Sequence, residues 1–130
     1  MLEDIKNEVA QRKLRTCETL QDYDSFVDSS WYYDPSMHGM MPEIGYVGLA
    51  LAGEAGEAAE KVKKFYRDAA GVENFGSTTA LMKELGDVLY YLTKLAHLHG
   101  NSLDDVARAN VKKLKDRAAR GEMRGSGDER

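Results

Sequence analysis

Apolar residues recur at helical spacing through two long stretches of this chain, 43–68 and 78–99. With about 100° of rotation per residue, one face of the second stretch carries Leu81, Leu85, Val88, Leu89, Leu92, Leu95 and Ala96. The corresponding face of the first stretch is built from smaller residues: Gly48, Leu51, Ala52, Ala55, Ala58, Ala59 and Val62. No run alternates between apolar and polar residues as a strand does. The chain is therefore expected to fold around two long helices.

Breaks between the helical stretches set the expected boundaries. The longest break, 29–42, holds both prolines, Pro35 and Pro42, and shorter ones follow at 71–77 and 100–102. Ser102 and Asp105 have the spacing of a capping box, which marks a helix start. We expect helices at 2–15, 20–29, 43–68, 78–99 and 103–120. This pattern predicts an all-α fold, a helical bundle of about five helices.

The length of 130 residues favours one domain, because no internal repeat or long linker divides the chain. We expect a single domain over 1–130. Within it, residues 1–19 form an N-terminal helical extension and residues 121–130 a glycine-rich, polar tail.

Composition narrows the classes of function. The net charge of −4 disfavours binding to a nucleic-acid polymer, which needs a basic face. Basic residues outnumber acidic ones from Arg108 onward, an asymmetry that suits a small anionic ligand. Cys17 is the only cysteine, which favours a reducing compartment. No apolar run approaches the roughly 20 residues that span a bilayer. We expect a cytoplasmic protein with no membrane partner.

Two pairs of carboxylates stand on the long helices. Glu54 and Glu57 lie three residues apart, as do Glu84 and Asp87, and such pairs share one side of a helix. Each pair borders the apolar face, so packing the two faces together should bring all four acids toward one another. Hard oxygen ligands in such a cluster favour Mg²⁺ or Mn²⁺. The alternative is a solvated surface whose glutamates pair within the helix, as Glu57–Lys61 and Glu60–Lys64.

The sequence around these acids resembles the MazG-like nucleotide pyrophosphohydrolases. The run from Tyr46 to Lys64 (YVGLALAGEAGEAAEKVKK) looks like the first catalytic helix of that family, and Glu84–Leu92 (ELGDVLYYL) looks like the second. Together they give the ExxE…ExxD pattern. Some members carry one more acid immediately before the first motif glutamate, where this chain has Gly53. The number of metal ions per site is thus left open.

The resemblance implies a hydrolase that cleaves (deoxy)nucleoside triphosphates between the α- and β-phosphates, giving a monophosphate and pyrophosphate. It implies Mg²⁺ as the cofactor, with Mn²⁺ able to substitute. Glu54, Glu57, Glu84 and Asp87 would hold the metal and serve as catalytic residues. One of these acids, or Glu60, would orient the attacking water. Purine deoxynucleotides such as dGTP are the favoured substrates, for nucleotide pool control or house-cleaning.

Further residues are candidates for substrate contact. Lys61 shares the face of Glu54 and Glu57 and is expected to act in catalysis and on phosphate oxygens, unless it only pairs with Glu57. Tyr91 would wall the site, with core packing as the alternative. Trp31 would stack on a base, with a core or subunit contact as the alternative. The last helix and the tail would supply further contacts from Asn110, Lys113, Arg117 and Arg124. The histidines His38, His97 and His99 show no metal-ligand arrangement and are interpreted as structural.

Small residues on the helix faces also predict assembly. Gly53, Gly56 and Gly86 lie inside helices, where close approach of another helix backbone would explain them. The helix faces offer more surface than one subunit covers, so we expect a homo-oligomer, with a tetramer favoured over a dimer. Two alternatives stay open. One is a related pyrophosphohydrolase for dUTP, dCTP or phosphoribosyl-ATP, and the other is a non-catalytic helical oligomerisation module.

Overall fold

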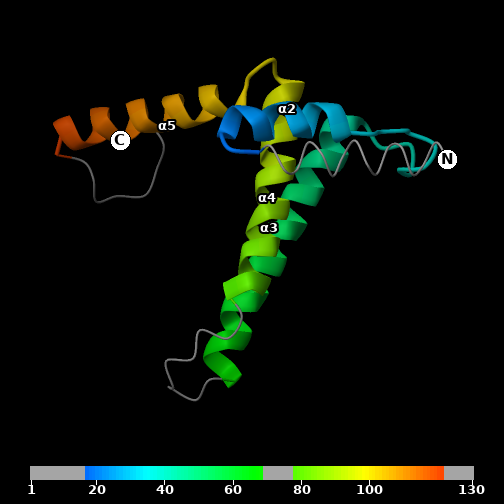
Figure 1. Cartoon of the computed structure of the whole chain (residues 1–130), viewed down its shortest axis with the longest axis horizontal. Coiled ribbons are helices and arrows are strands. Elements are labelled where there is room, and N and C mark those ends of the chain that lie inside the picture. The colour runs from blue at the N-terminus through cyan, green and yellow to red at the C-terminus, as the bar shows by residue number, and fades with distance from the viewer. Residues whose placement is uncertain (1–16, 69–77, 122–130) are drawn as a thin grey trace.

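The computed structural model describes residues 17–68 and 78–121 (Figure 1). The described chain is all-helical and contains no strand. Its helices are α2 (Leu20–Ser30), α3 (Glu43–Asp68), α4 (Thr78–Leu98) and α5 (Leu103–Ala119). The predicted all-α fold is confirmed, and each of these helices lies within a residue of its expected bounds. The helix expected at 2–15 and most of the tail lie outside the described residues.

Helices α3 and α4 pack side by side as a long antiparallel pair, the principal contact between elements of the fold. Helix α2 lies across the end of this pair where α3 begins and α4 ends (Figure 1). From the same end, α5 runs outward, away from the α3–α4 pair. It contacts α2 and α4, but no contact with α3 occurs between the described elements.

Local sequence explains where α2 and α5 begin. Thr19 caps α2 and Ser102 caps α5, and each forms a full capping box with the aspartate three residues later. The box predicted for Ser102 and Asp105 is therefore confirmed. In each box the hydroxyl of the capping residue accepts a hydrogen bond from the backbone N–H of the aspartate. The aspartate carboxylate in turn accepts one from the backbone N–H of the capping residue. Both helices thus start on polar contacts that need no tertiary packing.

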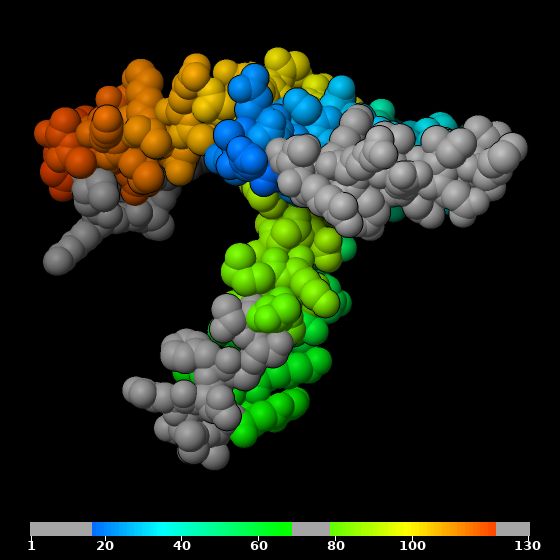
Figure 2. All heavy atoms as spheres, viewed as in Figure 1, coloured from blue at the N-terminus to red at the C-terminus, as the bar shows by residue number. Residues whose placement is uncertain are grey.

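Few side chains are buried within the single chain. Val27, Val47, Ala58 and Leu103 are the apolar residues of the described core. Large apolar side chains on α3, α4 and α5 remain in solvent, among them Leu49, Val62, Leu85, Val111 and Leu114. The space-filling view shows the same narrow, branched shape (Figure 2). The described part of one chain therefore leaves much of its apolar surface uncovered.

The helix glycines do not mark close packing inside the chain. A Cβ atom added to Gly53, Gly56 or Gly86 would meet no described atom within 4 Å. The expectation that another helix backbone lies against them is wrong for contacts within one chain. The reason is that the position of a Cβ atom at each of these glycines is open space among the described residues.

Candidate metal and nucleotide site

Three of the predicted acids converge between α3 and α4. Glu54 of α3 and Glu84 and Asp87 of α4 each place one carboxylate oxygen so that all three atoms lie within 4.8 Å of one another. Glu54 and Glu84 are half-buried, and Asp87 is exposed. The i,i+3 spacing aligns Glu84 with Asp87 on one side of α4, and antiparallel packing brings Glu54 opposite them. The geometry therefore joins two motifs that are separate in the sequence.

The carboxylates of this group repel one another, and the repulsion acts most clearly on Glu54. Burial raises the pKa of Glu54, and the charges of Asp87, Glu84 and Glu57 raise it further. A cation held among these oxygens would relieve the repulsion that adds to the effect of burial on this pKa. Carboxylate oxygens are also the ligands that Mg²⁺ and Mn²⁺ prefer. The donor set thus fits a hard divalent cation.

The fourth predicted ligand, Glu57, stands apart from the other three. Its side chain is exposed, and it does not belong to the described group of acids whose ligand atoms lie within 4.8 Å. Its charge still contributes to the raised pKa of Glu54, so it remains an electrostatic neighbour. Glu57 therefore borders the acidic group from the solvent side.

Lys61 reaches across to the acidic group. Its Nζ lies 3.2 Å from Oε1 of Glu84 on the other helix. The sequence spacing offers Glu57 as a partner within the same helix, whereas this ion pair joins α3 to α4. The other in-helix pair, Glu60–Lys64, is present at 3.7 Å, and Lys63 also approaches Glu60 at 2.5 Å. A positive charge thus already lies beside the converging carboxylates.

Tyrosines flank the acidic group. Burial raises the pKa of Tyr91, and the neighbouring Tyr46 and Glu54 raise it further, with a hydrogen bond between the two tyrosine side chains. Tyr91 therefore lies within the electrostatic reach of Glu54. On the other side, Tyr23 of α2 donates a hydrogen bond to the Gly86 carbonyl at 3.5 Å. Burial and the charges of Tyr90 and Asp87 raise its pKa to about 12.

Trp31 follows α2 and packs on α4. Its Nε1–H donates to Oε1 of Glu43 at 2.7 Å, and its ring lies 6.0 Å from Tyr90 and 6.2 Å from Tyr91. The Lys94 ammonium lies 5.3 Å from the ring centroid, a cation–π distance. Trp31 therefore holds the end of α2 against α3 and α4, and through Tyr91 it neighbours the acidic group.

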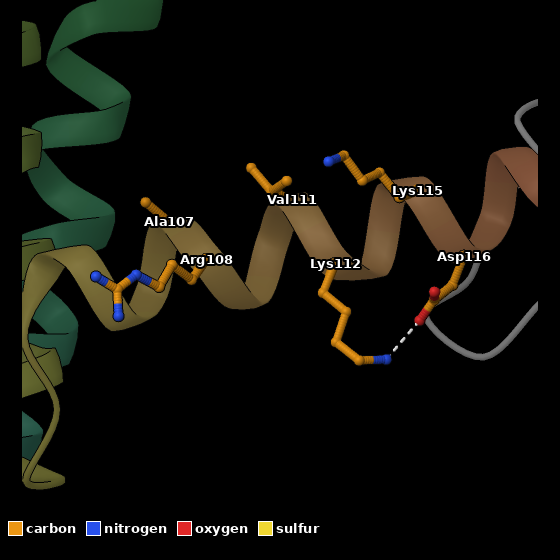
Figure 3. A pocket seen from close by; sticks show the side chains of 6 residues that line it. All are labelled: Ala107, Arg108, Val111, Lys112, Lys115 and Asp116. Atoms are coloured by element: carbon orange, nitrogen blue, oxygen red, sulfur yellow. Dashed lines mark hydrogen bonds and ion pairs between the residues drawn. The ribbon is translucent and has the colours of Figure 1, made fainter.

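The structure does not bring the candidates on α5 to the acidic group of the same chain. Asn110 and Lys113 are exposed and Arg117 is half-buried, on a helix that points away from α3. Arg124 lies outside the described residues. A shallow surface pocket lies along α5 (Figure 3), and the described residues that line it all belong to α5: Ala107, Arg108, Val111, Lys112, Lys115 and Asp116. The described lining includes no residue of the acidic group, so this pocket is separate from it.

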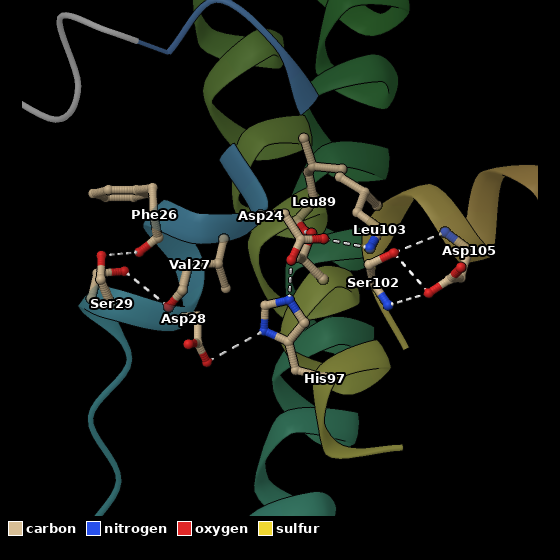
Figure 4. Close-up of polar contacts among 12 residues, drawn as sticks. Asp24, Phe26, Val27, Asp28, Ser29, Leu89, His97, Ser102, Leu103 and Asp105 are labelled. Carbon is tan, nitrogen blue, oxygen red and sulfur yellow. Dashed lines mark hydrogen bonds and ion pairs between the residues drawn. The ribbon is translucent and has the colours of Figure 1, made fainter. Parts of the chain in front are cut away.

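A buried polar junction was not singled out by sequence reasoning. Asp24 of α2 binds His97 of α4 and the backbone N–H of Leu103 at the start of α5 (Figure 4). His97, interpreted from the sequence as structural, here contacts the Asp24 carboxylate. Asp24 carried no recognisable signal, because its partners lie 73 and 79 residues away in the sequence.

Comparison with known proteins places this architecture in a family. Residues 46–121 match the MazG nucleotide pyrophosphohydrolase domain, a match that includes the acidic group and all of α5. The chain is also 45% identical over 87 residues to the Gene 37 protein of Mycobacterium phage L5, an alignment covering 67% of this chain and 76% of that protein. No solved structure matches significantly.

The chain belongs to the MazG nucleotide pyrophosphohydrolase family, and the resemblance of its ExxE…ExxD motifs is confirmed. Members of this family act on nucleotides and depend on metal ions in general. The acidic group of Glu54, Glu84 and Asp87 is a possible site for such an ion. None of the described helices is long and apolar enough to cross a membrane.

Proposed function

We propose that this protein hydrolyses (deoxy)nucleoside triphosphates between the α- and β-phosphates, giving a nucleoside monophosphate and pyrophosphate. The observation that carries the proposal is the convergence of Glu54, Glu84 and Asp87 from both family motifs. The acids would bind Mg²⁺, with Mn²⁺ as a substitute. When bound, the ion supplies charge neutralisation for the phosphate oxygens.

The chain's own acids divide into two groups under this proposal. Glu54, Glu84 and Asp87 hold the cation, and Glu57 borders them on the solvent side. Glu57 would either complete the ligand set or orient the attacking water. Glu60 is the weaker candidate for the water, because a hydrogen bond from Lys63 lowers its pKa and its oxygens face Lys63 and Lys64.

Positive and aromatic side chains would position the nucleotide. Lys61, already 3.2 Å from Glu84, would transfer its contact to a phosphate oxygen when a cation occupies the acids. Tyr91 would wall the site beside Glu54. Trp31 packs against Tyr91 and would offer a ring edge or face to the base.

A second copy of the chain would complete the site. Helix α5 carries Asn110, Lys113 and Arg117 away from the acids of its own chain, and apolar residues on α3, α4 and α5 remain in solvent. Docking α5 of one copy on the α3–α4 pair of another would cover both surfaces and bring the basic residues to the phosphates. We propose a homo-oligomer, and a tetramer rather than a dimer.

The base preference of this site is also part of the proposal. We favour purine deoxynucleotides such as dGTP, acting in pool control or house-cleaning. The test is pyrophosphate release from all common NTPs and dNTPs, with dUTP, dCTP and phosphoribosyl-ATP in the panel, in Mg²⁺ and in EDTA. The expected products are monophosphate and pyrophosphate, with the highest kcat/KM for a purine deoxynucleotide.

The outcomes separate the alternatives. Preference for dUTP, dCTP or phosphoribosyl-ATP would replace the substrate but keep the reaction type. Formation of diphosphate and orthophosphate would overturn the reaction type itself. No turnover, together with no Mg²⁺ or nucleotide binding by calorimetry, would leave a non-catalytic oligomerisation module.

A further inference from the structure

A single carboxylate joins three helices at the end of the α3–α4 pair. Oδ1 of Asp24 on α2 accepts a hydrogen bond from Nε2 of His97 on α4 at 2.5 Å. Oδ2 of the same group accepts the backbone N–H of Leu103, the first residue of α5, also at 2.5 Å. Figure 4 shows the two bonds diverging from the carboxylate toward the two helices.

The junction is shielded from water. The side chains of Asp24 and His97 are 18% and 13% exposed, and Leu103 is 6% exposed. Hydrogen bonds to a charged acceptor are strong in such surroundings, and losing the acceptor leaves two donors without a partner. Nδ1 of His97 is itself buried without a hydrogen-bond partner, so the bond to Asp24 is the hydrogen bond that holds this ring among the described residues.

Asp24 acts on α5 from outside that helix. The capping box of Ser102 and Asp105 satisfies donors within α5 but does not connect it to another element. The bond from Leu103 to Asp24 makes that connection, at the one end of α5 that touches the rest of the described fold. The direction of α5 is therefore set at its first turn.

The length of α5 turns a small tilt at its first turn into a large displacement further along the helix. Asn110 and Lys113 stand about 10 and 15 Å along α5 from Leu103, at about 1.5 Å per residue. A tilt of about 10° at the first turn would move them by roughly 2–3 Å on this rise. Misplacement by about 1 Å can cost on the order of a hundredfold in rate when a contact is used in catalysis.

We propose that Asp24 is a positioning residue: it fixes the direction of α5 and thereby the placement of Asn110 and Lys113 at the nucleotide. The proposal rests on the function proposed above, in which these residues contact substrate. Asp24 lies on α2 and does not belong to the acidic group. Its loss should therefore affect substrate affinity before it affects metal binding.

Asp28 provides a matched control. It lies one turn further along α2 and approaches Nδ1 of the same histidine, but at 4.0 Å and with 76% of its side chain exposed. Such an exposed pair contributes little. Asp24→Ala is the test variant and Asp28→Ala the control. Asp24→Asn is the conservative variant, since its amide can donate to His97 while its oxygen still accepts from Leu103.

The first measurement reports the direction of α5 without requiring activity. In a Cys17→Ser background, spin labels at Ala59→Cys on α3 and Ala118→Cys on α5 give an interhelix distance distribution. Dilution with unlabelled chain keeps the distances within one copy. Wild type, Asp28→Ala and Asp24→Asn should give one narrow distribution, and Asp24→Ala a broad or shifted one. An unchanged distribution in Asp24→Ala would overturn the proposal.

The second measurement is the split between KM and kcat for the best triphosphate. Asp24→Ala should raise KM about tenfold or more, while the Mg²⁺ concentration for half-maximal rate stays within twofold. Asp24→Asn should restore most of the wild-type KM. A broad distance distribution with wild-type KM would refute the positioning role. An inactive wild type would refute the proposed function instead, and the distance measurement would still report on Asp24.

Folding is checked by circular dichroism. If Asp24→Ala loses its helix content, His97→Ala takes its place, because it removes one bond and keeps the other. A smaller broadening and a smaller rise in KM would then support the role of the junction. Wild-type values for both in folded His97→Ala would count against it.

Discussion

Lys61 and Glu84 face each other across the two long helices, with Nζ of the lysine 3.2 Å from Oε1 of the glutamate. Glu84 is one of the three converging acids, so the ammonium of Lys61 lies beside them. In the metal-free chain it relieves some of the repulsion among the carboxylates. By the proposed function, the lysine would compete with a metal ion for Glu84 and would turn to phosphate once the ion is bound.

Replacing Lys61 should therefore have opposite effects on metal and on substrate. In Lys61→Met we expect Mn²⁺ to bind several-fold more tightly in the absence of nucleotide, because its competitor is gone. The same variant should show a KM for triphosphate raised about tenfold, since a charge-assisted hydrogen bond is lost. Calorimetry and steady-state kinetics measure the two effects. Lys64→Met, whose lysine pairs with Glu60, should change neither.

Substitutions of Glu57 and Asp87 should differ in how much they lower turnover and metal affinity. Asp87→Asn should lower turnover at least about a hundredfold, the scale of losing one group that stabilises the transition state. It should also weaken Mn²⁺ binding, because Asp87 belongs to the converging group. Glu57→Gln should lower kcat with a smaller loss of metal affinity. Near-normal turnover in both variants would refute the proposed ligands.

Stability should depend on pH through Glu54. Burial and three neighbouring acids raise its pKa, so the folded chain holds this proton more tightly than the unfolded chain. Its contribution to stability is present below the ordinary value of 4.5 and is lost as pH rises through the raised one. In EDTA, Glu54→Gln should therefore gain stability over wild type between acidic and neutral pH.

Urea unfolding across this pH range measures the effect. For Glu60 the contribution to stability changes with pH in the opposite direction. The hydrogen bond from Lys63 lowers the pKa of Glu60, so its contribution is present above the ordinary value and is lost as pH falls. Glu60→Gln should thus be less stable than wild type near neutral pH. Equal pH slopes for both variants would contradict the assigned causes.

Assembly should depend on the uncovered apolar side chains. Leu85 is 44% and Val111 50% exposed in the single chain. Leu85→Glu and Val111→Glu should each shift a tetramer toward smaller species by light scattering at micromolar concentration, with KM rising as α5 contacts are lost. Met37→Glu, in an exposed loop, is the control. A fully active wild-type monomer would contradict the oligomer.

The helices of this fold could be predicted because residues close in sequence determine where each one begins and ends. Pro42 stands before α3, and Ser102 with Asp105 opens α5, so spacing alone located those boundaries. Convergence of Glu54 with Glu84 and Asp87 also followed from the i,i+3 pattern on two packed faces. The exposure of Glu57 did not follow from that pattern, because residues three apart still differ by about 60° around a helix. One member of the pair faced the partner helix while the other faced solvent.

The sequence pattern could not predict contacts between distant elements. The i,i+4 rule proposes Glu57 for Lys61, yet the flexible lysine reaches Glu84 on another helix. The direction of α5 depends on Asp24, which periodicity cannot connect to Leu103. Both cases involve side chains that cross from one helix to another, and such crossings depend on how the helices are docked.

The three converging acids lie on helices that follow each other directly in the chain, α3 and α4. A contact between consecutive helices needs a shorter loop to close than one between α2 and α5, and structures dominated by such local contacts form fastest. We therefore expect the carboxylates to come together early in folding, before α2 and α5 dock. At that moment their repulsion opposes the hairpin, so added Mg²⁺ should speed the folding of wild type and not that of Asp87→Asn.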